Sequence, residues 1–518
     1  MKIATEIFLV LLFCLSGCNG LVVRSNNKRT RHLATTLHST TEDVDIDVAA
    51  NQARIASLPL PPSRSPGPFR GLRESISHLS NNCRFVRKRA DELGDVFLTN
   101  VFFQPTVIIG GQEAVQEFVS GTELKSKVIH CALPDSFQEL HTKWGTLNLD
   151  ANDIIFKQGR ELFAGVFSVD GLKEYTPIIN EAMDLYLEGL VDRVKTKPDE
   201  EIQLVPELKA LNLRTFSKIF SGEGLTDEQV QMFEDYNSAL LALPFEKKKL
   251  EKGAYALETL KEVMLSRYQE FQQGNPTKAN HFFFTQVSNR EGWVDDRVCT
   301  AMVLFIWGAY IETASLMVNS MTAINKYNPD YVNIILEEVQ AEEKKDGASP
   351  LKFSYWSNLE QTLGVLRESL RLIPPGGGTP RYSEEDFELL GYRIPAGTAV
   401  MLDPRVGETD PKLFTDPNEF KPTRWVPETS SSSTSKCPFQ GTALKLGFGS
   451  WFPGGFGAHQ CPGVPLSELT SKMFLTKTIK AFNGWSFGKG TKRNGEVKFV
   501  EVPIKIPVDE LGVKFSLR

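Results

Sequence analysis

A single cysteine, Cys461, follows a glycine-rich loop and opens a run that we expect to be a helix, from Val464 to Phe482. Glycines let a backbone approach a flat ligand closely and point N–H groups at a nearby sulfur atom. The positive end of a helix dipole favours thiolate over thiol. The pattern therefore predicts a thiolate suited to be the axial ligand of haem iron, although a glycine-rich turn around a buried structural cysteine would look the same.

An acid and a hydroxyl, Glu312 and Thr313, are neighbours inside a strongly apolar run from Val298 to Met317, which we expect to be one long helix. An unpaired buried carboxylate is costly. The acid therefore indicates either a functional position inside the protein or a helix on which Glu312 simply faces solvent.

A charged pair and a segment rich in proline and glycine lie between this run and the cysteine. Glu368 and Arg371 are three residues apart and would share one helix face, just before Pro374 and Pro375. By spacing alone such a pair could equally be a solvated surface pair. Further on, proline and glycine residues with short apolar alternations from 376 to 398 predict a small β-meander.

Together and in this order, these motifs resemble those of the cytochrome P450 family. The loop supplies Gly457, Cys461 and Gly463 in the family's register, with Gly454 where Phe is usual and His459 where Arg is usual. The resemblance implies a mostly α P450 fold with a small β-rich lobe. It also implies haem b as the cofactor, Cys461 as the iron ligand, and Gly457, His459 and Gly463 beside the haem.

The same resemblance gives roles to the other charged residues. Glu312 and Thr313 would relay protons to oxygen at the haem. Arg381 would reach a haem propionate, and Arg160 would be a second propionate ligand or a plain surface arginine. The structural charge cluster of the family would be Glu368, Arg371 and Arg424, buried and locking the loops below the haem.

The implied reaction is hydroxylation of a small apolar substrate of the sterol, isoprenoid/carotenoid or fatty-acid class with O₂. The electron donor must be a separate protein, because no flavin or iron–sulfur segment is fused to the chain. It would be ferredoxin-like in a plastid, or a flavin reductase at the endoplasmic reticulum. The segments Cys461–Gly463 and Pro374–Gly378 are most similar to the branch containing retinoid, sterol and brassinosteroid hydroxylases.

Two departures from the family pattern keep alternatives open. Tyr310 stands where a small residue is usual, so its phenol either crowds the oxygen pocket or is turned away. Together with Gly454, it leaves room for a P450-type enzyme that rearranges fatty-acid hydroperoxides, although the Glu312–Thr313 pair speaks against this. A non-catalytic haem-binding sensor or carrier is the third reading.

Composition and charge exclude other classes of protein. A net charge of −6 and a pI of about 5.8 argue against nucleic acid as a partner. The seven cysteines are scattered without paired spacing in the main body, which excludes a disulfide framework or a zinc site. The hydrophobic content of 41% is enough for one large core, which we expect to be the haem domain at 59–518.

The N-terminal segment predicts a targeting address. We expect a signal peptide at 1–20, a transit-peptide-like segment at 21–41 and a disordered polar linker at 42–58. The apolar run Ile7–Leu15 is too short to span a bilayer, which needs about 20 residues, and leaves only a peripheral membrane contact open. This bipartite leader resembles that of plastids of complex origin. A secretory or endoplasmic-reticulum signal, or a bacterial lipoprotein box at Leu15–Cys18, is the alternative.

Overall fold

The computed structural model describes residues 50–518 except 65–69, 102–103, 120–128, 132–134, 141–143, 148, 241, 243–244, 275–281, 289, 379, 427–450 and 502–504. The predicted signal peptide and transit segment lie outside the described residues, as does 42–49 of the predicted linker. The remainder of that linker corrects the expectation of disorder, because residues 50–56 are helical. Ile55 is buried there, and Arg54 forms an ion pair of 2.6 Å with Glu388.

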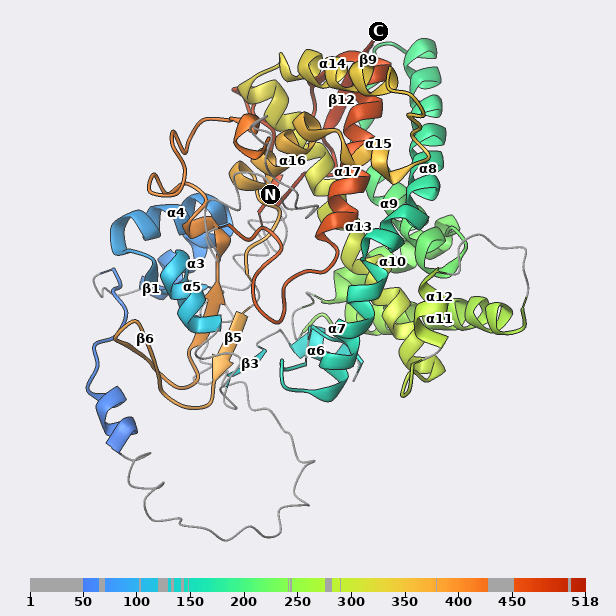
Figure 1. The fold of residues 1–518 in the computed structure, drawn as a ribbon. Coiled ribbons are helices and arrows are strands. Elements are labelled where there is room, and N and C mark those ends of the chain that lie inside the picture. Colours follow the sequence, from blue (N-terminus) through green and yellow to red (C-terminus); the bar gives the residue numbers. More distant parts are fainter. Residues whose placement is uncertain are drawn as a thin grey trace.

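Helices make up most of the described chain (Figure 1). The longer ones are α3 (Arg70–Ser80), α4 (Asn82–Leu93), α7 (Ile154–Val166), α8 (Val169–Thr196), α9 (Leu204–Ser221), α10 (Asp227–Leu240), α11 (Lys247–Gln272), α13 (Asp295–Tyr327), α14 (Tyr331–Glu343), α16 (Glu360–Leu372) and α17 (Val464–Ala481). The short ones are α5 (Gln112–Glu117), α6 (Asp135–Leu140), α12 (Phe282–Ser288) and α15 (Phe353–Ser357), with 3₁₀ turns η2 (Pro404–Val406) and η3 (Pro422–Trp425).

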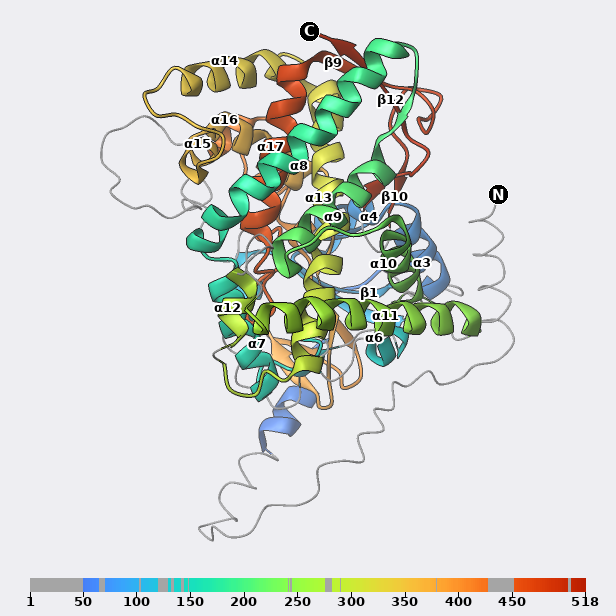
Figure 2. The same ribbon diagram turned by 90° about the vertical axis from the view of Figure 1, so that its right-hand side faces the viewer.

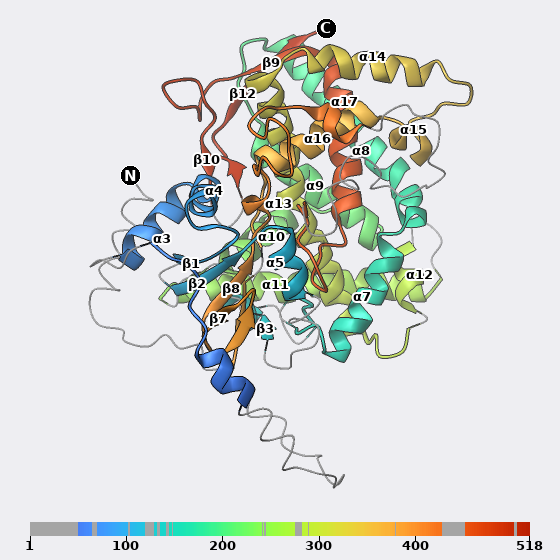
Figure 3. The same cartoon turned by 60° about the vertical axis from the view of Figure 1, so that its left-hand side comes forward.

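Most of the strands before α17 form a small lobe beside the helices, whereas those after α17 lie along the helical body (Figure 3). They are β1 (Val96–Val101), β2 (Gln104–Ile109), β3 (Ile129–Cys131), β4 (Ile202–Gln203), β5 (Pro380–Ser383), β6 (Phe387–Leu389), β7 (Tyr392–Ile394), β8 (Ala399–Leu402), β9 (Phe482–Phe487), β10 (Phe499–Val500), β11 (Ile506–Pro507) and β12 (Gly512–Leu517). The main sheet has the order β1-β2-β8-β5-β3, in which β2 and β8 are parallel. The expected short strands are present as β5 to β8, but they do not form a meander: β5 pairs with β8 in the main sheet, and β6 pairs with β7 in a separate hairpin.

Helix α13 runs through the middle of the helical body (Figure 2). It is longer at both ends than the sequence predicts, and it packs against α9, α11, α16 and α17. Neighbours on several sides explain why its sequence is apolar around most of its circumference. Within the described part of the chain it is the one helix long and apolar enough to cross a membrane, and most of its apolar stretch is buried inside the protein.

The main sheet holds the loop that carries the cysteine. Phe452 at the beginning of this loop is buried in the same apolar cluster as Val107 and Ile109 of β2 and Val400 and Leu402 of β8. The other end of the loop continues into α17, which packs on α13. The loop therefore spans from the β-rich lobe to the helical body, and both of its ends are fixed by buried apolar contacts.

Candidate active site

The cysteine loop (residues 451–463) is shaped by its glycines. The Cys461 N–H donates a hydrogen bond of 2.7 Å to the carbonyl of Gly454. A side chain at Gly454 would place its Cβ 2.5 Å from Cγ2 of Val464, so a glycine is needed where the family usually has Phe. Gly457 has a φ of +80°, in the left-handed region that side chains avoid. The loop thus turns tightly and delivers Cys461 to the start of α17.

Cys461 is exposed although protein surrounds it on most sides. This burial raises the pKa of its thiol, while the backbone N–H groups of Gly463 and Val464 lower it. The favourable helix-end effect expected from the sequence is present, but burial outweighs it. A thiol of this kind becomes a thiolate readily only when a cation, such as a metal ion, compensates the charge.

One face of α13 is not fully covered by the surrounding protein, which leaves space in front of it. Its partly or fully accessible residues recur at helical spacing: Ala301, Leu304, Phe305, Gly308, Ala309 and Glu312. A Cβ placed on Gly308 would meet no atom within 4 Å. The charges of Glu312 and Cys461 interact, which places the carboxyl and the sulfur near each other. The polar end of the stripe and the cysteine therefore lie near each other.

Glu312 is the polar end of this stripe. Its side chain is partly exposed to the space, yet the surrounding protein raises the pKa of its carboxyl to about 7 by removing bulk water. This is the range in which a carboxyl can both give and accept a proton near neutral pH.

Thr313 does not share the position of Glu312. It is only 1% exposed, and its hydroxyl donates a hydrogen bond of 3.0 Å to Oγ of Ser467 on α17. The family motif predicts a shared role for Glu312 and Thr313. In the structure, however, the two side chains have different neighbours. Ser467 was not singled out from the sequence, because a serine on an apolar helix carries no distinctive pattern.

Tyr310 is turned away from the cysteine. Its side chain is fully buried beside the Glu234 carboxyl group of α10, and burial together with that carboxyl raises the pKa of the phenol. Its carbonyl accepts a hydrogen bond of 3.1 Å from Nδ2 of Asn212 on α9. Of the two orientations left open by the sequence, the structure has the one that does not crowd the oxygen side.

Basic side chains from α7 and the loop surround the cysteine on another side. Nη1 of Arg160 donates a hydrogen bond of 2.7 Å to the carbonyl of Gln460, and the charges of Arg160 and Cys461 interact. Nε2 of His459 donates to the carbonyl of Leu149 at 2.9 Å, and its ring lies 4.5 Å from the ring of Phe156. The structure thus brings Arg160 and His459 to the same loop.

Arg381 lies on β5 and is 4% exposed, with Nη1 3.4 Å from the carbonyl of Pro380. Strand β5 pairs with β8, whose residues pack on Phe452 of the cysteine loop. Arg381 therefore belongs to the lobe that supports this loop.

Glu368, Arg371 and Arg424 lie together in one cluster. The Glu368 carboxylate accepts two hydrogen bonds from Arg371, at 2.7 and 2.9 Å, and one of 3.2 Å from Arg424. It also accepts from the indole N–H of Trp425 at 2.9 Å. Glu368 and Arg371 are fully buried, so each charge depends on the other for compensation. The sequence reading did not include the Trp425 indole in this cluster.

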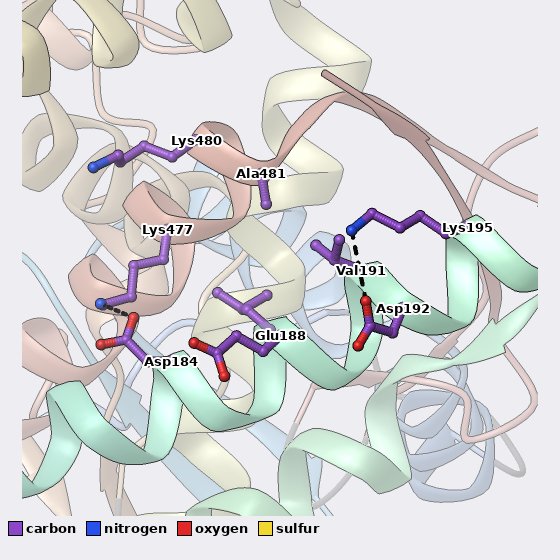
Figure 4. A pocket seen from close by; sticks show the side chains of 9 residues that line it. Asp184, Glu188, Val191, Asp192, Lys195, Lys477, Lys480 and Ala481 are labelled. Atoms are coloured by element: carbon purple, nitrogen blue, oxygen red, sulfur yellow. Dashed lines mark hydrogen bonds and ion pairs between the residues drawn. The ribbon is translucent and has the colours of Figure 1, made fainter.

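A surface groove between α8 and α17, of about 500 Å³, is separate from this site (Figure 4). Its walls carry charged side chains, and two of them, Asp184 and Lys477, form an ion pair across it. None of the residues discussed above lines it. A mixed-charge groove open to water is a poor match for the apolar chemistry that the α13 stripe suggests.

Comparison with known proteins defines the class of protein. The family model described as Cytochrome P450 matches residues 61–503, and the chain belongs to this family of haem monooxygenases. A zebrafish relative, cytochrome P450 26A1, is 25% identical over 480 residues and covers 88% of this chain and 90% of its own. A Synechocystis relative, putative cytochrome P450 120, is 24% identical over 476 residues, with 88% of this chain and 97% of its own covered.

A solved structure shares the fold. It is described as retinoic acid bound cyanobacterial CYP120A1, and it aligns with a TM-score of 0.71 at 22% identity over 89% of this chain and all of its own. The expected fold, mostly α with a small β-rich lobe, is confirmed. The family's cofactor, haem b, was also expected correctly.

The described residues fit a haem group. Cys461 is exposed, and the nearby face of α13 is left open at Gly308, where an added Cβ would meet no atom within 4 Å. A flat, largely apolar ring needs such a gap. Arg160 and His459 at the edge of the loop supply the donors that carboxylate substituents of the ring would require.

Proposed function

We propose that this chain hydroxylates a small apolar substrate of the isoprenoid, sterol or fatty-acid class, with Cys461 as the haem-iron ligand. In the overall reaction, a C–H bond, O₂, two electrons and two protons give a C–OH group and water. The observation that carries the proposal is that the charges of Cys461 and Glu312 interact, so the cysteine and the acid lie near each other. Haem bound there supplies oxygen activation supported by the thiolate.

The residues around that space have separable tasks. Gly457 and Gly463 give the loop the close approach that a flat ring needs. Arg160, His459 and Arg381 would hold the haem propionates, since their side chains can donate to carboxylates. The proximity of Glu312 suits it to moving a proton within the space.

The other three site residues act at a distance from the chemistry. Glu368, Arg371 and Arg424 hold the chain segments below the cysteine loop in place through their buried ion pairs. Because these side chains compensate one another's charges, they stabilise the fold and touch neither substrate nor cofactor.

The substrate class is supported by the apolar character of the α13 stripe. Apart from Glu312, it presents Ala301, Leu304, Phe305 and Ala309 to the space. The fold neighbour is described with retinoic acid bound, which favours an elongated isoprenoid among the candidate classes. The hydroperoxide-rearranging alternative loses its main support, because Tyr310 is turned toward Glu234 and away from Cys461.

The electron donor and the cellular location belong to this proposal as well. We infer a ferredoxin-like donor in a plastid of complex origin, on the basis of the leader composition. A flavin reductase at the endoplasmic reticulum is the alternative if the leader acts as a secretory signal.

A spectral screen tests the function. The haem-loaded protein is titrated with retinoic acid, a carotenoid, a sterol and a fatty acid, and ligands that displace water from the haem are then tested for turnover. We expect an isoprenoid to give both a spectral shift and reductase-dependent hydroxylated product. Consumption of a fatty-acid hydroperoxide without reductant, and no O₂-dependent product, would contradict monooxygenation.

The identity of the iron ligand is tested in the same preparation. Cys461→Ser should lose the absorbance band typical of thiolate-bound ferrous–CO haem, because a serine oxygen is a poor haem ligand. Cys299→Ser is the matched control, since Cys299 is buried on α13 and its burial raises the pKa of its thiol to about 12. Retention of the band by Cys461→Ser would remove this residue from the site.

A further inference from the structure

A surface pocket of about 310 Å³ lies between α3 and α4, on the lobe that contains β1 (Figure 3). None of the residues of the candidate active site lines it. Ser77 and Ser80 of α3 bring hydroxyl groups to the pocket, and the chain has a net charge of −6. Against that acidic background, four of the lining side chains are cationic: Arg64, Arg84, Lys88 and Arg89.

The charges around the pocket do not balance. The Glu74 carboxylate accepts hydrogen bonds of 2.7 and 2.9 Å from the guanidinium of Arg89. The carboxylate oxygens of Glu92 lie 3.2 Å from Nε of Arg64 and 3.1 Å from Nη1 of Arg89. The contact of Glu92 with Nζ of Lys88 is longer, at 4.0 Å. Four positive charges thus meet two negative ones, and two positive charges remain uncompensated.

Arg84 is the cationic side chain with the fewest attachments. It is exposed, and its guanidinium has no hydrogen bond or ion pair to any residue that the structure describes. Its backbone N–H donates a hydrogen bond of 3.0 Å to Oδ1 of Asn81, which caps α4. Since Asn81 already satisfies the helix end, the positive charge of the pocket comes from its side chains. Lys88 lies one turn after Arg84 on the same helix face.

Arg89 is the fixed member of the set. It is only 4% exposed, and its guanidinium carbon lies 4.9 Å from the centroid of the Phe85 ring. Its partner Glu74 also accepts a hydrogen bond of 2.9 Å from the hydroxyl of Thr99 on β1. This part of the pocket is therefore built on the sheet and does not depend on exposed side chains alone.

We propose that this pocket binds a phosphate group, carried either by a soluble phosphate compound or by the headgroup of an anionic lipid. A guanidinium such as that of Arg84 can pair with two phosphate oxygens at once, and an ammonium such as that of Lys88 supplies a further donor. A doubly charged phosphate would compensate the two unbalanced charges. The pocket is larger than one phosphate group, so the atoms attached to the phosphate have room as well.

The two sources would have different consequences for the protein. A lipid headgroup would hold the protein at a bilayer, in which apolar compounds dissolve. A soluble phosphate compound would bind the folded protein and stabilise it. Neither consequence depends on the reaction at Cys461, so failure of this proposal is distinguishable from failure of the proposed hydroxylation.

The first experiment is a calorimetric titration of the full-length, haem-loaded protein with pyrophosphate at constant ionic strength. Arg84→Ala should bind pyrophosphate about tenfold more weakly, because charge-assisted hydrogen bonds to the ligand are lost. Arg73→Ala is the matched control. Arg73 is an exposed arginine of α3 that does not line the pocket, so its removal should leave the affinity as in the wild type.

A second variant has the opposite expected sign. Glu92→Gln removes the carboxylate that Arg64 and Lys88 share, so it should bind pyrophosphate about fivefold more tightly. Asp91→Asn changes an exposed carboxylate next in sequence that does not contact these cations, and it should match the wild type. A damaged fold could only weaken binding, so tighter binding by Glu92→Gln cannot come from misfolding.

Sedimentation with vesicles distinguishes the two sources. The probes are phosphatidylcholine vesicles with and without phosphatidic acid, whose headgroup is a bare phosphate. A lipid source predicts sedimentation only with phosphatidic acid, about tenfold weaker for Arg84→Ala and unchanged for Arg73→Ala. A soluble source predicts pyrophosphate binding without sedimentation. The proposal is overturned if neither probe binds, or if Arg84→Ala and Arg73→Ala weaken binding equally, as expected for general attraction to positive charge.

Discussion

The guanidinium group of Arg160 donates a hydrogen bond of 2.7 Å to the carbonyl oxygen of Gln460, which fastens helix α7 to the residue before Cys461. The contact joins residues 300 positions apart, and burial lowers the pKa of this arginine while the nearby Cys461 sulfur favours its charge. Arg160 thereby couples the wall of the site to its cysteine.

The first prediction concerns this coupling. Arg160→Ala should release haem about tenfold faster to a scavenging apoprotein, because a charge-assisted hydrogen bond and a propionate donor are both lost. Haem transfer is measured by the change in the haem absorbance. Lys157→Ala, an exposed change on the same helix, is the control and should behave as the wild type. Equal release from both variants would show that Arg160 does not hold the haem.

The second prediction concerns the buried charge cluster. Glu368→Ala should lower the free energy of unfolding by roughly 3–5 kcal/mol, since Arg371 and Arg424 would lose their shared partner. Chemical denaturation of the holoenzyme gives the value. Glu360→Ala, an exposed glutamate at the start of the same helix, should change it little. A small loss in Glu368→Ala would mean that water reaches the cluster.

The third prediction concerns pH and Glu408. This side chain is fully buried near Arg87, and burial raises the pKa of its carboxyl to about 7. The folded protein therefore holds a proton that the unfolded chain releases near the ordinary glutamate pKa. Stability should fall as pH rises from about 4.5 to about 7, by roughly 3 kcal/mol from this residue.

Glu408→Gln tests the sign of that effect. The amide does not ionise, so the unfolding free energy of this variant should decline less than that of the wild type over the same pH range. Denaturation at several pH values measures the difference between the two proteins. A steeper decline in the variant would show that Glu408 is ionised in the fold, held by Arg87.

The fourth prediction concerns the leader. Residues 1–41 fused to a fluorescent protein should direct it to the plastid in an alga whose plastid has extra membranes. Residues 1–20 alone should stop in the secretory pathway, because the transit-peptide-like segment is missing. Microscopy with a plastid marker distinguishes the outcomes. Secretion of the 1–41 fusion would favour the endoplasmic-reticulum alternative and a flavin reductase as the donor.

Much of this protein could be predicted from local sequence. The apolar run around Val298–Met317 predicts a long buried helix, since helical side chains repeat every 3.6 residues and the run exceeds several turns. The turn residues between 376 and 398 predict short strands, and glycines before Cys461 predict a tight loop. Each of these features depends on neighbours in the chain, which is why a pattern can predict it. The sequence did not predict the full length of α13 or the helix at 50–56. Their polar residues lack the apolar repeat that indicates a buried helix.

The directions in which the side chains of α13 point follow from tertiary packing. Tyr310 is fixed by Glu234 of α10 and Asn212 of α9, and Thr313 by Ser467 of α17. These partners lie far away in the chain and come together through packing, which no local spacing encodes. An acid and a cysteine of the P450 type can be recognised in the sequence without the structure. Their proximity, and the contact of the Thr313 hydroxyl with Ser467, follow from how α13 packs against its neighbours.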